Sequence, residues 1–409
     1  MLPPAASESR GHFALRGKRA RALICGPVKA HRPLNPAAVS RRDVAKWLAM
    51  TCAVQPLVAA CGRGMRVAGV EPRGRRRLSR VLVEERRIIR QVVGLRPFRR
   101  SGFRLEVESL GDKVLIHNYG HGGGGVSLSW GTAQLALERA LQTPHRQAAV
   151  MGCGAVGLST ARLLQDHGFS VTIYARDLPP NTTSNIAGAQ WSPTTVVDSD
   201  RRTASFDAQF VSASRFAFRY YQLLVQPRYG VTWRENYFLS EAPRRPATGE
   251  HALVDDLIPL EDLAPNEHPF GRYHVARMRS MHIEPSVYLI AVLADFRLAG
   301  GRVVIREFPD AQSIAALSEP LVVNCTGLGA ATLFGDGDML PIKGQLTVLM
   351  PQPEIDYITI GPGGLYMMPR QDGIILGGTF ERGVSTLEPN ATETQRIVQG
   401  NRALFDSMS

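Results

Sequence analysis

Residues 148–157 read Ala-Ala-Val-Met-Gly-Cys-Gly-Ala-Val-Gly, a short apolar run followed by the pattern Gly-x-Gly-x-x-Gly. An apolar strand that leads through such a turn into an amphipathic helix lets backbone N–H groups approach a pyrophosphate at the positive end of the helix. The stretch therefore predicts a Rossmann-type dinucleotide-binding unit. Its phosphate-binding residues would be Gly152, Gly154, Ala155, Val156 and Gly157.

The residues after this turn continue the unit. A helix is expected to run to about His167, with Gly168 as its C-terminal stop, and residues 171–174 (Val-Thr-Ile-Tyr) are typical of the second strand. An acidic residue normally follows that strand and binds the ribose hydroxyls. Here Arg176 stands where the acid is expected and Asp177 follows it, so the ribose partner stays open. This motif alone does not exclude an NADP-type contact through Arg176.

A glycine-rich stretch precedes the fingerprint. Residues 117–131 read His-Asn-Tyr-Gly-His-Gly-Gly-Gly-Gly-Val-Ser-Leu-Ser-Trp-Gly, between an expected strand at 114–116 and an expected helix from about Ser129 to Leu141. The glycines oppose a helix at His117 and His121, so these two residues are not a helical zinc pair. Upstream, the alternation over residues 103–108 predicts a half-buried strand, and another strand is expected from Arg90 to Pro97.

Together these motifs resemble the D-amino-acid oxidase family of FAD-dependent enzymes. The resemblance covers residues 88–141 and 148–405, and further stretches that carry it are 94–97 (Gly-Leu-Arg-Pro), 182–191, 324–327 (Asn-Cys-Thr-Gly), 341–345, 365–369 and 376–379. In that family the stretch matching 117–131 lies near the C-terminus, whereas here it precedes the fingerprint. The resemblance therefore implies a circularly permuted chain. The implied fold is α/β, with a discontinuous Rossmann-type FAD-binding domain and an antiparallel-sheet substrate domain.

The resemblance also implies which residues bind the cofactor. FAD would lie on the fingerprint glycines, with Arg176 or Asp177 at the ribose. The loop along the pyrophosphate and flavin would contribute Thr182, Thr183, Ser184, Ala187 and Gly188, and the glycine-rich stretch would contribute Gly122, Gly124, Gly125, Val126 and Ser127. The positive end of the helix that follows this stretch would stabilise the reduced, anionic flavin. No metal is expected.

By the same resemblance, Arg96 would hold the carboxylate of the substrate, Tyr366 would share it, and the backbone carbonyl near Gly123 would accept from the amine. A guanidinium suits this role because its planar fork gives two parallel charge-assisted hydrogen bonds. Arg370 is the first alternative for the carboxylate. His117 and His121 are expected to be structural, since hydride transfer needs no side-chain base.

The implied reaction is oxidation of a D-amino acid to the imino acid, which hydrolyses to a 2-oxo acid and ammonia, while oxygen becomes hydrogen peroxide. Two alternatives stay open: a dehydrogenase that passes electrons to a membrane quinone, and an FAD-binding lipoprotein without turnover. The preferred side chain, the electron acceptor and the oligomeric state are not determined by the sequence.

The N-terminal part of the chain has a different composition. Residues 1–100 hold 23 Lys and Arg against 5 Asp and Glu, whereas the remaining residues hold 25 against 31. The net charge of +12 is therefore concentrated in a basic head on a mildly acidic body. This distribution favours a targeting segment and argues against a nucleic-acid-binding surface.

The head also contains motifs typical of export. Residues 40–46 (Ser-Arg-Arg-Asp-Val-Ala-Lys) match a twin-arginine signal, and the apolar run 47–60 is too short to span a bilayer, which needs about 20 residues. Residues 58–61 (Val-Ala-Ala-Cys) resemble a lipoprotein cleavage box with Cys61 as the lipidated residue. We therefore expect a periplasmic or cell-surface lipoprotein whose membrane contact is the lipid anchor. If the head is an artefact of the start site, the protein would be cytoplasmic.

These observations predict the following domain organisation: a leader and signal at 1–61, an Arg- and Gly-rich linker at 62–87, a permuted segment at 88–141, an FAD-binding core at 148–199 and 300–345, and a substrate domain at 200–299 and 346–409. In the body, Cys153 and Cys325 each lie in a small-residue turn after a predicted strand. We expect both to be free, packed thiols.

Overall fold

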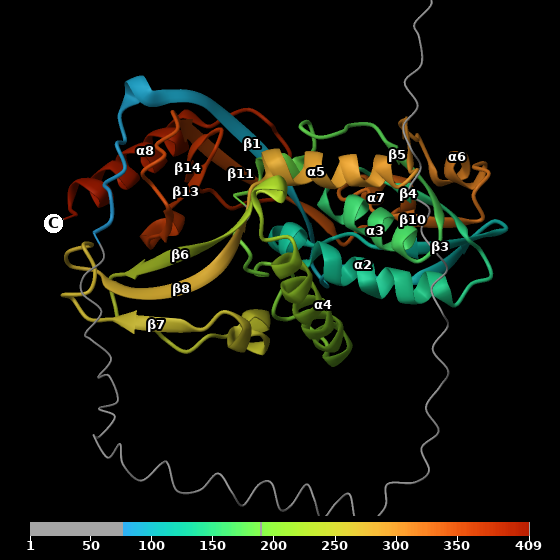
Figure 1. Cartoon of the computed structure of the whole chain (residues 1–409), viewed down its shortest axis with the longest axis horizontal. Helices are drawn as coiled ribbons and strands as arrows, with labels where there is room; N and C mark the ends of the chain where they lie inside the picture. Colours follow the sequence, from blue (N-terminus) through green and yellow to red (C-terminus); the bar gives the residue numbers. More distant parts are fainter. Residues whose placement is uncertain (1–76, 189, 409) are drawn as a thin grey trace, which may run out of the picture. The chain divides into compact units, whose positions relative to one another are not determined.

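A six-stranded sheet forms the first part of the computed structural model, which describes residues 77–188 and 190–408 (Figure 1). Its strands, in spatial order, are β2 (Val107–Leu110), β3 (Lys113–His117), β10 (Leu321–Asn324), β4 (Gln147–Met151), β5 (Ser170–Ala175) and β9 (Arg302–Ile305). All neighbouring pairs are parallel except β2 and β3, which form a hairpin. The sheet therefore combines three segments that lie far apart in the sequence.

Side chains that alternate along the strands are buried on both faces of this sheet, which is typical of parallel sheets. Ala148 and Val150 of β4 face a core that includes α2 (Gly125–Leu141), α3 (Ala155–Asp166) and α5 (Pro285–Leu298). Ala149 and Met151 face the opposite core, to which α6 (Ala311–Ala315) and α7 (Gly329–Phe334) contribute. Helices α2, α3 and α5 lie side by side on the first face (Figure 1).

A nine-stranded sheet forms the second part. Its main path is β1 (Ile88–Arg99), β11 (Met339–Leu349), β14 (Gly373–Gly377), β13 (Tyr366–Arg370), β12 (Tyr357–Ile360), β6 (Val231–Ser240), β8 (His274–Ile283) and β7 (Leu260–Leu263), and β15 (Glu381–Arg382) pairs with β11. Helix α8 (Ala391–Asp406) packs on one face. The opposite face packs against Ile186, in the loop after β5.

The remaining elements connect these parts. Helix α4 (Ala204–Leu223) packs against α2, and its first turn is capped by Thr203, whose hydroxyl accepts from the N–H of Phe206. The short 3-10 helices are η1 (Glu85–Arg87), η2 (Gly122–Gly124), η3 (Thr183–Ile186), η4 (Pro227–Tyr229), η5 (Gly249–Leu253), η6 (Asp255–Leu257) and η7 (Pro362–Gly364).

The predicted fold class is confirmed: a discontinuous Rossmann-type sheet lies beside a second, largely antiparallel sheet. Three details differ. The pair β6–β12 is parallel, so the second sheet is mixed. Strand β11 begins at Met339, inside the segment assigned to the FAD-binding core, yet it pairs in the nine-stranded sheet. Helix α2 begins at Gly125 because burial of Val126 and Leu128 offsets the low helix propensity of the glycine run.

The predicted strand at residues 103–108 is wrong in extent. Arg104 forms only an isolated bridge with Tyr119, and the strand β2 starts at Val107. Both Phe103 and Leu105 are buried, at 4% exposure each, so side-chain packing holds the stretch together with the backbone bonds at Arg104 and Glu106. Alternation alone does not distinguish such a segment from a paired strand.

The two body cysteines are free, as expected, with Cys153 buried and Cys325 half-buried.

The export motifs and Cys61 lie outside the described residues, as does most of the linker. Within the described residues, no helix is long and apolar enough to cross a membrane, and no group of His, Cys, Asp or Glu side chains is placed to hold a metal ion.

Candidate functional site

The fingerprint turn connects β4 to α3, and two of the fingerprint glycines leave no room for a side chain. Gly152 has φ +107°, a conformation that only glycine adopts readily, and a Cβ there would lie 2.5 Å from the carbonyl oxygen of Cys325. A Cβ at Gly157 would overlap the carbonyl of Gly152. The backbone of β4, α3 and the turn after β10 thus meet at one point, at the carboxyl ends of two adjacent parallel strands. This is the place where open α/β sheets bind ligands.

The N-terminus of α3 lies against the loop that follows β5. The backbone N–H of Ala155 donates to Ser184 Oγ at 3.0 Å, and Gly154 is the N-cap residue, with Val156 in the first helical turn. Thr182 and η3 (Thr183–Ile186) belong to the same loop. The structure therefore brings together the two groups of residues that the sequence assigns to the pyrophosphate.

The ribose end of the predicted site is exposed. Arg176 Nε donates to Asp177 at 2.8 Å, and its Nη1 donates to Glu307 at 3.3 Å. The hydrogen bond with Asp177 raises the pKa of Arg176. Two carboxylates therefore lie beside this guanidinium and would repel the phosphate group of an NADP-type ligand. Glu307 was not identified from the sequence, since it lies 131 residues from Arg176 and reaches this end only because β9 pairs with β5.

The glycine-rich loop forms a second candidate binding surface that consists mainly of backbone. Gly123 is exposed, and its backbone N–H donates to the Thr195 carbonyl at 3.0 Å. Gly122 has φ +54°, and a Cβ there would overlap that same carbonyl. Ser127 Oγ accepts from the N–H of Ser192 at 3.1 Å, which holds the first turn of α2 against residues 190–195.

The start of α2 fits the edge of a flavin. Its N-cap, Gly124, supplies no side-chain hydrogen bond, so the first N–H groups of the helix have no side-chain cap. Gly125 and Val126 begin the helix at this point. An uncapped, positive helix end beside backbone without side chains provides the donors that an anionic ring edge requires. The residues present therefore fit the bound flavin that the sequence implies.

The loop after β5 is also fixed to the nine-stranded sheet. Arg370 Nη1 donates to the carbonyls of Asn185 at 3.1 Å and Ala187 at 3.2 Å. His282 Nε2 lies 3.1 Å from the carbonyl of Gly188 and donates to it. Burial lowers the pKa of His282 to about 3, so the imidazole is neutral at physiological pH. His282 could not be identified from the sequence, because a histidine in a strand has no distinguishing pattern.

Arg96 and Tyr366 lie together on the sheet face that packs against this loop. Arg96 Nη1 donates to the Thr379 carbonyl at 3.3 Å, and the guanidinium lies over Gly344, where a Cβ would be 2.6 Å from Nη1. Tyr366 packs in the same apolar cluster as Ile186. Its ring lies over Gly377, which has no side chain to displace it.

The charge state of this pair suits an anionic ligand. Desolvation of the Tyr366 hydroxyl raises its pKa, an effect that the adjacent Arg96 partly offsets, so the phenol stays protonated and can donate. No carboxylate of the described residues forms an ion pair with Arg96. Arg370 differs, because Asp372 binds it through two hydrogen bonds of 2.8 Å each and two loop carbonyls take up Nη1. The geometry therefore favours Arg96 over Arg370 as the carboxylate ligand.

The two histidines of the glycine-rich stretch are buried and hydrogen-bonded to other side chains. His121 Nε2 lies 3.0 Å from Thr132 Oγ1, and burial lowers the pKa of His121 to about 3. His117 accepts at Nδ1 from the Asn324 amide at 3.1 Å, so its Nε2 donates to Glu108 at 3.0 Å. Burial lowers the pKa of His117 as well, with Glu108 acting against this shift. Both histidines therefore have structural contacts, and neither is exposed to solvent.

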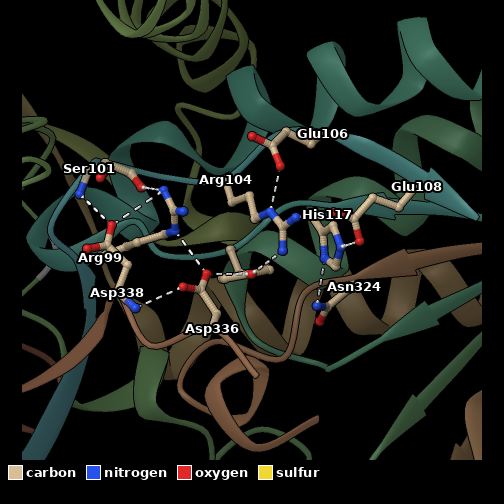
Figure 2. A network of polar contacts seen from close by, with 11 residues as sticks. Arg99, Ser101, Arg104, Glu106, Glu108, His117, Asn324, Asp336 and Asp338 are labelled. Carbon is tan, nitrogen blue, oxygen red and sulfur yellow. Dashed lines mark hydrogen bonds and ion pairs between the residues drawn. The ribbon is translucent and has the colours of Figure 1, made fainter. Parts of the chain in front are cut away.

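His117 belongs to a polar network that joins the segment before the fingerprint to the turns after β10 (Figure 2). Arg104 contacts Glu106 and Glu108, and Arg99 Nε donates to Asp336 at 2.9 Å. Arg104 also donates to the hydroxyl of Tyr119, which donates to Asp336 at 2.7 Å. Asn324 Oδ1 accepts from the N–H and hydroxyl of Thr326, at 3.1 and 2.7 Å. Figure 2 shows that residues 99–117 contact Asn324 at the end of β10 and Asp336 and Asp338 before β11.

The chain matches the model of the family described as FAD dependent oxidoreductase over residues 147–408. It is 32% identical over 262 residues to a D-amino-acid oxidase of Rubrobacter xylanophilus, covering 63% of this chain and 77% of that protein. It is 28% identical over 283 residues to the D-aspartate oxidase of Homo sapiens, covering 64% and 76%. Among solved structures, glycine oxidase from Geobacillus kaustophilus matches with a TM-score of 0.49 and 15% identity, covering 64% of this chain and 80% of that one.

The chain therefore belongs to the family of FAD-dependent oxidoreductases. It is an oxidoreductase, and its cofactor is FAD. The cofactor prediction made from the fingerprint and the loop after β5 is confirmed. The family match begins at β4, so residues 88–141, which include Arg96 and Gly123, lie outside the matched range.

Proposed function

We propose that the protein oxidises a D-amino acid to the imino acid, which hydrolyses to a 2-oxo acid and ammonia, with oxygen as the electron acceptor and hydrogen peroxide as its product. One observation carries this proposal: Arg96 is half-buried beside a protonated tyrosine and pairs with no carboxylate of the described residues. A half-buried guanidinium in that state is suited to bind an external anion.

The chain's own residues would orient the substrate. Arg96 and Tyr366 would hold the carboxylate, and the exposed backbone at Gly123 would accept from the amine. Bound FAD would supply the acceptor for the hydride from the α-carbon. Since no residue needs to remove a proton from carbon, alignment of the α C–H bond is the main contribution of the protein.

The surroundings of Tyr366 favour an uncharged side chain. Directly paired residues of neighbouring strands share a face of the sheet. The pairing places Gly377, Tyr366, Ile360, Phe238 and Ala276 in one row across β14, β13, β12, β6 and β8. This row offers apolar surface and no second cation. It supports a small or apolar D-amino acid over D-aspartate, although a D-aspartate oxidase is among the relatives.

The test is a D-amino-acid panel with FAD-loaded protein. We expect a yellow protein that releases peroxide with D-alanine, reacts more slowly with D-aspartate, and does not react with L-alanine. Reduction of an artificial dye without peroxide would indicate a dehydrogenase with another acceptor. A bound flavin that no amino acid reduces would contradict the proposal and favour a binding protein without turnover.

We also propose that the chain is circularly permuted. In support, the family match begins at β4, while β3, which precedes it in sequence, completes the same parallel sheet beside β10. Strand β1 pairs with β11 along its whole length. The segment 88–141 thus supplies β1 to the nine-stranded sheet and β2 and β3 to the six-stranded sheet, as an integral part of the fold does. Chain ends of domains tend to lie close together, which makes such rearrangements physically accessible.

A further proposal concerns export, and it rests on the sequence of the head alone. We infer that the protein follows the twin-arginine route and carries a lipid on Cys61. Changing Arg41 and Arg42 together to lysine is expected to retain the precursor inside the cell, and Cys61→Ala to prevent lipidation. The measurements are cell fractionation and the mass of the mature N-terminus. Unprocessed protein free in the cytoplasm under native expression would overturn this inference.

A further inference from the structure

Helix α8 reaches the substrate end of the site through one side chain. Arg396 Nη1 donates to the carbonyl of Gly363 at 3.0 Å, and its Nη2 donates to the carbonyl of Gly378 at 2.8 Å. The remaining nitrogen, Nε, donates to Glu393 at 2.8 Å, one turn earlier on the helix. The guanidinium group therefore links α8 to two backbone segments, at Gly363 and Gly378, which are 15 residues apart in the sequence.

These two segments flank the proposed carboxylate site. Gly363 lies in the loop 361–365, which leads directly into Tyr366, and the N–H of Gly378 donates to the Gly364 carbonyl in that loop at 3.0 Å. The segment 377–379 carries the ring of Tyr366 on its glycines. It also presents the Thr379 carbonyl to Arg96 at 3.3 Å.

The loop 361–365 is closed by two backbone hydrogen bonds of its own, from the N–H of Gly361 to the Leu365 carbonyl at 2.7 Å and from the N–H of Leu365 to the Pro362 carbonyl at 3.4 Å. Gly363 and Gly364 are both exposed, with φ of +67° and +73°. Its apolar anchor is Leu365, which fills the notch left by Gly400 of α8, where a Cβ would lie 2.5 Å from Leu365 Cδ1. Glycines lose more conformational freedom on ordering than other residues, so the contacts from α8 add to these backbone bonds in keeping Gly363 and Gly364 ordered.

We propose that Arg396 is a positioning residue for substrate binding: it fixes the loop 361–365 against the segment 377–379 and thereby sets the position of Tyr366 relative to Arg96. This inference rests on the proposed function, because it takes Arg96 and Tyr366 as the carboxylate site. Helix α8, which packs on the opposite face of the sheet, would therefore influence the affinity for the substrate.

The test compares Arg396→Met with Arg402→Met in the FAD-loaded, full-length protein. Arg402 is a matched control, since it lies on the same helix, its side chain is also 38% exposed, and it too donates to a backbone carbonyl, from its Nε to that of Val83 at 2.8 Å. For Arg396→Met we expect KM for D-alanine to rise about 10-fold while kcat changes little, because two charge-assisted hydrogen bonds at a partly exposed site are lost. Arg396→Lys should recover part of this loss, because the ammonium group can donate to one of the two carbonyls.

Two further measurements do not depend on turnover. The affinity for propionate, which is alanine without its amine, is read from the flavin absorbance and should weaken in parallel with KM. Amide hydrogen exchange at Gly364, Leu365 and Gly378 should accelerate in Arg396→Met and stay unchanged in Arg402→Met.

Equal effects of the two variants, or unchanged KM and exchange in Arg396→Met, would overturn the proposal. If the wild-type protein oxidised no D-amino acid but Arg396→Met still loosened the loop and weakened propionate binding, the positioning role would hold and the proposed substrate class would fail.

Discussion

Replacing Arg96 by alanine is expected to leave FAD bound and to lower kcat/KM for D-alanine by about 30-fold to several-thousand-fold. This range corresponds to the roughly 2–5 kcal/mol lost when one partner of a desolvated, hydrogen-bonded charge pair is removed. The guanidinium is half-buried over Gly344, and the hydroxyl of Tyr366 cannot replace its charge. The measurement is steady-state kinetics of peroxide release, with the flavin spectrum as the check on cofactor loading.

Two variants separate charge from geometry at this site. Arg96→Lys should rescue little, because an ammonium offers no two-pronged contact to align the substrate. Tyr366→Phe should cost less than Arg96→Ala, since it removes a single hydrogen bond of about 0.5–1.5 kcal/mol and leaves the charge in place. If Arg96→Ala retained near-normal kcat/KM, the carboxylate would have to bind elsewhere. Arg370 is then a poor substitute, because Asp372 and two loop carbonyls already occupy it.

The parts of the site that could be predicted from the sequence are those built from backbone. At Gly152 and Gly157 a side chain would overlap a neighbouring carbonyl, and at Gly122 the same holds. Such positions leave a strong signal, because only one residue type fits. Arg96 and Tyr366 were identified through the resemblance to a family, and the sheet register then placed them on one face.

The residues that the sequence did not reveal act through long-range contacts. Arg370, considered only as an alternative carboxylate ligand, instead holds the loop after β5. His282 reaches the same loop from β8, and Arg396 reaches Gly363 and Gly378 from α8. Each is a common residue type in an ordinary strand or helix. The role of each residue depends on which strands pair and on which face of the sheet a helix covers. The residues next to it in the sequence do not specify the distant groups that it contacts.

The strand at 103–108 illustrates the converse error. Its alternation of apolar and polar residues is real, since Phe103 and Leu105 are buried. The backbone, however, forms only an isolated bridge at Arg104 and one hydrogen bond at Glu106 before β2 begins at Val107. Burial and backbone pairing are separate properties, and the hydrophobic period reports the first of them.

Gly152→Ala is expected to weaken FAD binding by at least about 100-fold and to lower the melting temperature. Two physical effects combine at this position. A φ of +107° is a strained conformation for alanine, which costs on the order of 1–3 kcal/mol. In addition, the new Cβ would lie 2.5 Å from the Cys325 carbonyl oxygen, and this neighbour is backbone that cannot rotate away. The turn would have to move off the N-terminus of α3, where the pyrophosphate is expected to bind.

Gly168→Ala separates these two effects, because it shares the first and lacks the second. Gly168 ends the same helix with φ +82°, and a Cβ there would meet nothing within 4 Å. It should therefore lose only about 1–2 kcal/mol of stability from the left-handed backbone and keep its affinity for FAD. The measurements are thermal unfolding of the apoprotein and titration with FAD. If both variants lost FAD equally, backbone strain in the βα unit would be the cause. If Gly152→Ala bound FAD as tightly as the wild type, the fingerprint turn would not be the pyrophosphate site.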